Sequence, residues 1–187
     1  GKKEAKEREL FTLRKRVKEL GQKLIDGEQA KLLIQSVALE TQNTLQYHIA
    51  GIVSMALAAV FPDPYEFQIE FVERRGKTEC DLWFVRDNNK LNPLDATGGG
   101  ACDVASFALQ CTAWSLKGGR AVLILDEPFR NLSVGLQPKA SEMMKMLSER
   151  LKLQIIMVSH LPGIIDNADK VFDVTQVKGV SNVRERQ

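Results

Sequence analysis

The chain has 187 residues, of which 44% are hydrophobic and 27% are charged, an ordinary composition for one globular domain with an appendage. Its formal net charge of +2 argues neither for nor against a nucleic-acid partner. The three cysteines lack C-x-x-C spacing, and no apolar run reaches the roughly 20 residues of a membrane span, so we expect a cytoplasmic protein without a membrane segment.

Apolar residues near the N-terminus follow the three-and-four spacing of a coiled-coil seam. The seam consists of Leu10, Leu13, Val17, Leu20 and Leu24. Gly27 interrupts it, and helical periodicity then continues to about Val60. We therefore expect residues 1–60 to form a coiled-coil arm and a continuing helix. A seam of two heptads is equally typical of a plain surface helix, so the sequence leaves both interpretations open.

After two prolines the pattern changes from helical to alternating. Residues 66–73 alternate between apolar and polar side chains, which is typical of a strand with one buried face. Residues 78–86 are a second strand candidate, and Gly76 lies between the two. We expect a hairpin here, followed by a polar loop over residues 87–95.

A cluster of glycines precedes the next predicted helix. Thr97 and Gly98–Gly100 lead into an apolar segment, residues 101–116, which we expect to be helical. Glycines at a helix start leave backbone N–H groups approachable, and the helix dipole adds partial positive charge there, so the loop suits phosphate. The other interpretation is a flexible loop that leads into a core helix.

Two adjacent carboxylates follow the most apolar short run of the chain. Residues 121–125 lead directly into Asp126 and Glu127, and the run is typical of a buried strand of a parallel sheet. The acids then lie at its carboxyl end, where open α/β sheets place ligands. One carboxylate there can hold Mg²⁺ beside phosphate, and the next can orient or deprotonate a water. The plainer interpretation is a solvated strand end before a turn.

The rest of the chain alternates between helix and strand patterns. Residues 137–152 predict an amphipathic helix, residues 153–159 a buried strand that ends at His160, and residues 170–176 a final strand. This order predicts a parallel sheet with helices packed on it. In a right-handed crossover the two strands lie close together, so His160 could face the same crevice as the two acids. A purely structural histidine is the alternative.

Three motifs in this order resemble the C-terminal half of an ABC-type ATPase head of the SMC/SbcC/RecF class. They are the glycine-rich loop before a helix, the strand AVLILDEP and the strand IIMVSH. The match covers residues 97–175, and the N-terminal helix extends it. The resemblance implies an α/β half-head, with a parallel sheet, packed helices and a β-hairpin in residues 61–187, after a coiled-coil helix in residues 1–60.

The resemblance also implies a role for each motif. Asp126 would match the Walker B aspartate that supports Mg²⁺, Glu127 the glutamate that activates the attacking water, and His160 the residue that contacts the γ-phosphate of ATP. The glycine-rich loop would match the signature loop, which grips the ATP of the opposite protomer, and a D-loop would follow the acidic strand. The residues implied are Thr97, Gly98, Gly99 and Gly100 in the signature loop and Asn131, Leu132 and Ser133 in the D-loop.

The sequence departs from the family pattern at two of these positions. The family usually has Ser before its two glycines, and alignment on the following helix places Gly98 there. An alignment shifted by one residue places Thr97 there instead, so that Thr97 could supply the hydroxyl. In the D-loop, Ser133 stands where an aspartate is usual, which affects communication between protomers rather than the nucleotide site itself.

The resemblance implies an ATPase for DNA repair or recombination, with ATP and Mg²⁺ bound between two heads of a homodimer and with DNA and a nuclease subunit as further partners. No G-x-x-x-x-G-K-[ST] occurs in the sequence, and the chain starts at Gly1. We therefore expect a piece of a longer protein whose N-terminal half carries the Walker A loop, and we expect this chain alone to be inactive. The alternative is a non-hydrolysing coiled-coil interaction or structural subunit with a degenerate head.

Overall fold

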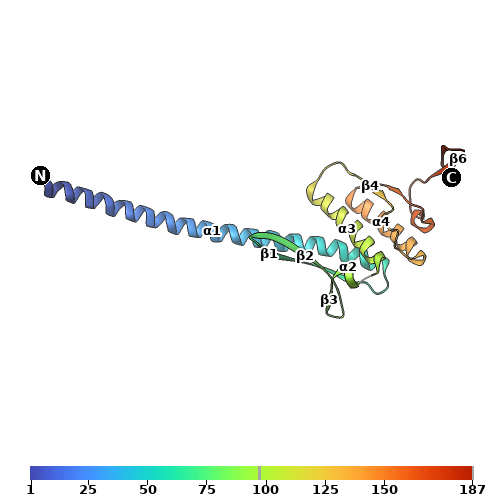
Figure 1. Cartoon of the computed structure of the whole chain (residues 1–187), viewed down its shortest axis with the longest axis horizontal. Coiled ribbons are helices and arrows are strands. Elements are labelled where there is room, and N and C mark those ends of the chain that lie inside the picture. Colours follow the sequence, from blue (N-terminus) through green and yellow to red (C-terminus); the bar gives the residue numbers. More distant parts are fainter. Residues whose placement is uncertain (97, 187) are drawn as a thin grey trace. The chain divides into compact units, whose positions relative to one another are not determined.

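The structure is a computed structural model that describes residues 1–96 and 98–186. The chain divides into two compact units, residues 1–45 and residues 46 onward. The first unit belongs entirely to helix α1 (Lys2–Val60), which is also the element that enters the second unit. Figure 1 shows α1 as one unbroken helix. Among the described residues, no helix is both long and apolar enough to cross a membrane.

The predicted N-terminal helix is confirmed, and Gly27 does not break it. A glycine within a helix costs only about 1 kcal/mol relative to alanine, which the many flanking helix formers can offset. The five seam side chains, from Leu10 to Leu24, are each more than half exposed. The seam is therefore an apolar stripe on the surface of the first unit.

The second unit begins with an antiparallel sheet. Strands β1 (Glu66–Arg74) and β2 (Lys77–Arg86) form the predicted hairpin, in a register that pairs Phe67 with Phe84. The alternation of the sequence places these two rings in the core. Ser54 on the last part of α1 fixes the edge of the sheet, because its hydroxyl accepts the backbone N–H of Phe67 at 2.8 Å.

The prediction of a polar loop over residues 87–95 is wrong. This segment contains a third strand, β3 (Asn89–Leu91), and a short helix, α2 (Pro93–Ala96). Asp87 and Asn88 both adopt positive φ, 51° and 61°, which gives a two-residue turn whose twist matches that of paired strands. The chain therefore returns along β2 at once, and the sheet has the order β1-β2-β3.

A parallel pair of strands carries the sequence motifs. Strand β4 (Val122–Asp126) pairs with β5 (Gln154–Val158), so that Asp126 lies opposite Val158. Between them the chain passes through a 3₁₀ turn, η1 (Val134–Leu136), and helix α4 (Gln137–Leu151). These elements confirm the predicted strands at 121–125 and 153–159 and the helix between them. The prediction that both strands are buried is wrong for one face of the pair, where Val122, Ile124, Ile156 and Val158 are each at least 40% exposed.

Helix α3 (Gly99–Lys117) precedes β4 and packs against α4, and the two run close together in Figure 1. The ring of Phe107 on α3 contacts that of Phe129 at a centroid distance of 5.4 Å, and both rings are buried. This contact anchors the segment after β4 to the helix that follows the glycine-rich loop.

The last predicted strand exists, but it does not join the parallel sheet. After the turn η2 (Pro162–Ile165), strand β6 (Phe172–Val177) pairs antiparallel with β7 (Val180–Glu185). The positive φ values of Lys178 and Gly179, 51° and 80°, make another two-residue hairpin turn. A local antiparallel hairpin therefore replaces the crossover that the strand–helix–strand pattern predicts.

Candidate functional site

The candidate site lies at the carboxyl end of the β4–β5 pair. Asp126 is the last residue of β4, and Glu127 follows it with a φ of 46°, in the left-handed region. The backbone N–H of Glu127 donates to the carbonyl of Val158 at 2.9 Å and so extends the ladder by one bond. An unfavourable backbone conformation of a non-glycine residue is often found where a side chain has to be aimed at a site.

The side chain of Glu127 is held by two partners from the end of β5. The imidazole Nδ1 of His160 lies 2.9 Å from Oε1 of Glu127, and the Ser159 hydroxyl donates to Oε2 at 3.3 Å. The same hydroxyl accepts the backbone N–H of Leu161 at 3.2 Å. The structure thus brings Glu127 and His160 together, as the parallel arrangement of their strands requires.

Hydrogen bonding decides the charge of this glutamate. The bond from His160 lowers the pKa of Glu127 below its ordinary value, Ser159 adds to the effect, and partial desolvation opposes it. The imidazole remains largely exposed. Glu127 is therefore an ionised carboxylate at neutral pH, beside a histidine that solvent or a ligand can reach.

Asp126 has a different environment from its neighbour. It is exposed at the strand end, and its carboxylate makes no hydrogen bond or ion pair among the residues that the structure describes. No group of three or more potential metal ligands occurs in the described part of the chain. A single free carboxylate fits Mg²⁺, which commonly takes one or two protein carboxylates and completes its shell with water and phosphate oxygens.

The glycine loop, residues 98–100, lies at the start of α3 against the segment that follows β4. A Cβ on Gly99 would lie 2.8 Å from Cβ of Asn131, and one on Gly100 would lie 3.1 Å from a methyl group of Leu132. Glycine is thus required at position 99 for this close approach, and a side chain at position 100 would need a small shift of its neighbours. Thr97, the alternative donor of a hydroxyl, lies outside the described residues.

The carboxylate of Asp103 reinforces this contact between the two segments. It accepts the backbone N–H of Asn131 at 2.9 Å and the side-chain amide of the same residue at 3.2 Å. A hollow of about 240 Å³ lies beside the contact. It is lined by Phe61, Tyr65, Gly98, Gly99, Gly100, Ala101, Asn131, Leu132, Ser133 and Leu136. The structure therefore gathers Gly98–Gly100, Asn131 and Ser133 around one hollow.

Sequence reasoning missed Ser159 and Asp103. Ser159 immediately precedes His160, so its place at the strand end was a usable signal. Asp103 is the only acidic residue of α3 and lies in its second turn, but nothing in the sequence relates it to Asn131, which is 28 positions away.

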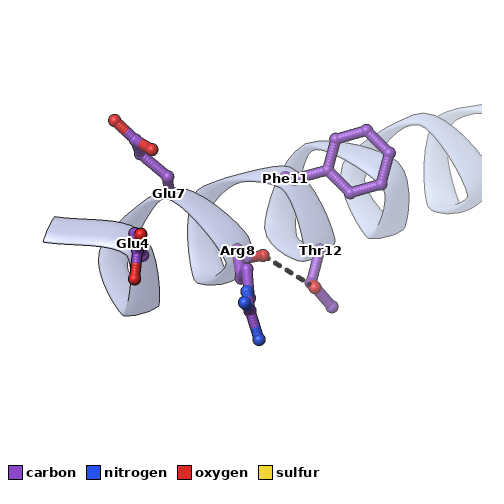
Figure 2. Close-up of a pocket in the computed structure, with 5 residues that line it drawn as sticks. All are labelled: Glu4, Glu7, Arg8, Phe11 and Thr12. Atoms are coloured by element: carbon purple, nitrogen blue, oxygen red, sulfur yellow. Dashed lines mark hydrogen bonds between the residues drawn. The ribbon is translucent and has the colours of Figure 1, made fainter. Parts of the chain in front are cut away.

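A second hollow lies on the first unit, and its geometry does not make a site. Figure 2 shows its lining residues along a single stretch of α1. They are Glu4, Glu7, Arg8, Phe11 and Thr12. The bond drawn is local, from the Thr12 hydroxyl to the carbonyl of Arg8 at 2.9 Å. Because all the side chains belong to neighbouring turns of one exposed helix, nothing converges on a ligand.

No protein-family model matches the chain, and no curated protein matches it by sequence. Solved structures do match. A structure from work on ATP-driven dimerisation and DNA-stimulated activation of SMC ATPases superposes with a TM-score of 0.62 at 18% identity, over 79% of this chain and 88% of the other.

Two archaeal structures extend the comparison. The Smc head with a coiled coil and joint from Pyrococcus yayanosii matches with a TM-score of 0.64 at 18% identity, over 86% of this chain and 31% of its own length. The Smc head from Pyrococcus furiosus, bound to the C-terminal domain of ScpA, gives 0.61 at 17% identity, over 74% of this chain and 34% of its own. The chain therefore has the fold of an SMC-type ATPase head, and it spans about a third of the length of these two relatives.

Proposed function

We propose that this chain is the C-terminal half of an SMC-like ATPase head that hydrolyses ATP between two heads. The observation that carries the proposal is the Glu127–His160 contact at the ends of two adjacent parallel strands, supported by Ser159. A charged, oriented carboxylate beside an accessible imidazole is an arrangement suited to water activation next to a phosphate. The likeness to SMC heads supports the same assignment.

Each site residue then has a distinct role. Asp126, which is exposed and unpaired among the described residues, would hold Mg²⁺, and that ion would neutralise charge on the phosphates. Glu127 would orient the attacking water, and His160 would leave Glu127 to contact the γ-phosphate. The glycine loop, together with Asn131 and Ser133, would bind the ATP of the opposite head around the hollow that they line.

The β4–β5 pair supports the proposal of a complementary N-terminal half. Its inner face packs on the core, while its outer face leaves four apolar side chains exposed. They are Val122, Ile124, Ile156 and Val158. A two-stranded sheet with an open apolar face gains stability from further strands or helices. We propose that the half carrying the Walker A loop covers this face, and that the assembled ATPase acts with DNA and a nuclease subunit in repair or recombination.

A non-hydrolysing subunit is the second candidate. Both carboxylate oxygens of Glu127 are already engaged, and Gly98 caps α3 without any side-chain hydrogen bond. A head that binds ATP without turnover would keep these features.

The Glu127→Gln substitution separates the two candidates. In a head reconstituted with the N-terminal half, turnover should fall by at least about a hundredfold, since the amide keeps the shape and loses the base. ATP binding should persist, and the ATP-bound dimer should accumulate on a sizing column. Asp126→Ala should instead weaken Mg·ATP binding. Glu142→Gln on the exposed face of α4 is the matched control. Near-normal turnover of Glu127→Gln would refute the proposed roles, and a wild-type head that binds ATP without turnover would favour the second candidate.

A further inference from the structure

Gln137 is a buried polar residue outside the proposed catalytic set. It is the first residue of α4, and only 1% of its surface is exposed. Its side-chain oxygen accepts the backbone N–H of Gly163 at 3.2 Å, and its amide nitrogen donates to the carbonyl of Leu132 at 3.5 Å. One side chain thus joins the segment that follows β4 to the segment that follows β5.

The contact at Gly163 is close as well as hydrogen-bonded. A Cβ on Gly163 would lie 3.0 Å from Cβ of Gln137. One turn further along α4, the buried Ser141 accepts the backbone N–H of Asn167 at 2.9 Å. Helix α4 therefore holds two points of the backbone that leads away from His160, which limits the positions open to residues 159–163.

On its other side the 131–132 segment is held by Asp103. That carboxylate takes both the backbone and the side-chain N–H of Asn131. The contacts form a continuous series from the glycine loop, through Asp103 and Asn131, to the Leu132 carbonyl, Gln137 and Gly163. The histidine loop, residues 159–163, ends this series and carries the hydroxyl that binds Glu127.

We propose that Gln137 and Asp103 are positioning residues that hold the glycine loop, the 131–132 segment and the histidine loop as one unit. Gln137 bonds to Leu132 and Gly163, and Asp103 bonds to Asn131, so each would act on the proposed nucleotide contacts through a neighbour that it holds. This positioning role adds to the proposed function, and its consequence for catalysis rests on that function. Gln137 and Asp103 would keep the glycine loop, which grips ATP, aligned with the Glu127–His160 pair.

The first test measures amide exchange by NMR in the 187-residue chain, without nucleotide. Gln137→Met keeps the volume and removes both hydrogen bonds, so exchange at Gly163 should speed up at least about tenfold. Asp103→Ala should speed up exchange at Asn131 and also at Gly163, which it does not contact. Gln110→Ala on the exposed face of α3 is the control. If Asp103→Ala changes exchange at Asn131 alone, the three segments are not one unit and the inference is wrong.

The second test uses the head reconstituted with its N-terminal half. Gln137→Met should lower kcat at least about tenfold while KM for ATP changes less than about twofold, because the histidine loop is misplaced, whereas Asp103 still holds Asn131 beside the glycine loop. An unchanged kcat in an active head would overturn the positioning role. A wild-type head without ATPase activity, combined with the predicted exchange changes, would reject the proposed function and leave the structural unit standing.

Discussion

Gly99→Ala tests the contact between the glycine loop and the segment after β4. The added methyl group would lie 2.8 Å from Cβ and 3.0 Å from Cγ of Asn131, whereas carbon atoms pack at about 3.5–4.0 Å. One of the segments must therefore move by roughly 1 Å. A rotamer change cannot remove the clash, since Cβ is fixed to the Asn131 backbone and Asp103 holds that backbone.

The magnitude follows from two opposing effects. Overpacking of a tight contact costs about 1–3 kcal/mol, while replacing glycine with alanine stabilises a permitted conformation by about 0.4–1 kcal/mol. We expect a net loss of about 1–2 kcal/mol in the free energy of unfolding. Urea unfolding can follow it through Trp83 and Trp114 fluorescence, because both tryptophans lie in the second unit.

Two other glycines provide matched controls. Gly135 in η1 has open space around a new Cβ, so Gly135→Ala should cost no stability and should instead add about 0.4–1 kcal/mol. Gly98 caps α3 in an extended conformation with open space around it, so Gly98→Ser should stabilise the chain by a few tenths of a kcal/mol through a capping bond. If Gly99→Ala is as stable as Gly135→Ala with an unchanged urea m-value, the close approach to Asn131 does not exist.

Three further predictions concern thiol chemistry, acid sensitivity and the N-terminal arm. Burial raises the pKa of the Cys111 thiol to about 12. A thiol reagent at pH 8 should therefore modify the exposed Cys80 and react with Cys111 only on unfolding. Modification of both thiols at equal rates would contradict the burial of Cys111. Because the bond from His160 lowers the pKa of Glu127, the contact stabilises the fold above the usual glutamate pKa of 4.5 and loses that contribution as the pH falls through the lower folded value. His160→Ala should raise the pKa of Glu127 toward 4.5, as read from its carboxyl ¹³C shift, and an unchanged shift would show that the bond is absent in solution. Hydrogen exchange over residues 1–26 should show weak protection, since a lone helix with an exposed seam is marginal in water, and strong protection would mean that the seam has a partner.

Sequence reasoning succeeded where one local pattern decides the structure. Strict alternation identified β1 of the hairpin, because only one face of such a strand can be buried, and the length of the apolar run before Asp126 identified β4. The approach of His160 to Glu127 was also predictable, since two parallel neighbours bring their carboxyl ends to the same edge.

The errors have a common cause in short turns that reverse the chain. The polar residues Asp87 and Asn88 predict a loop, but with positive φ values they form a tight turn, so that β3 pairs with β2. Lys178 and Gly179 do the same after β6, and so the last strand meets β7 instead of the parallel pair. Asparagine and glycine tolerate this conformation, but composition alone does not show which tolerant residue adopts it.

The contacts around Asn131 lie beyond any local pattern, and they change how the departures from the family pattern are understood. In the sequence, Gly98 stands where the family usually has a serine hydroxyl. In the structure Gly98 is the N-cap residue of α3 with open space around it, while Gly99 and Gly100 are the glycines that pack closely against Asn131 and Leu132. The bonds between Asp103 and Asn131 hold the segment after β4 in place, and they do so without an aspartate at position 133. These contacts explain how the segments pack, and a hydrolysing head and a degenerate subunit could both contain them. Turnover in the reconstituted head is therefore the measurement that separates the two candidates.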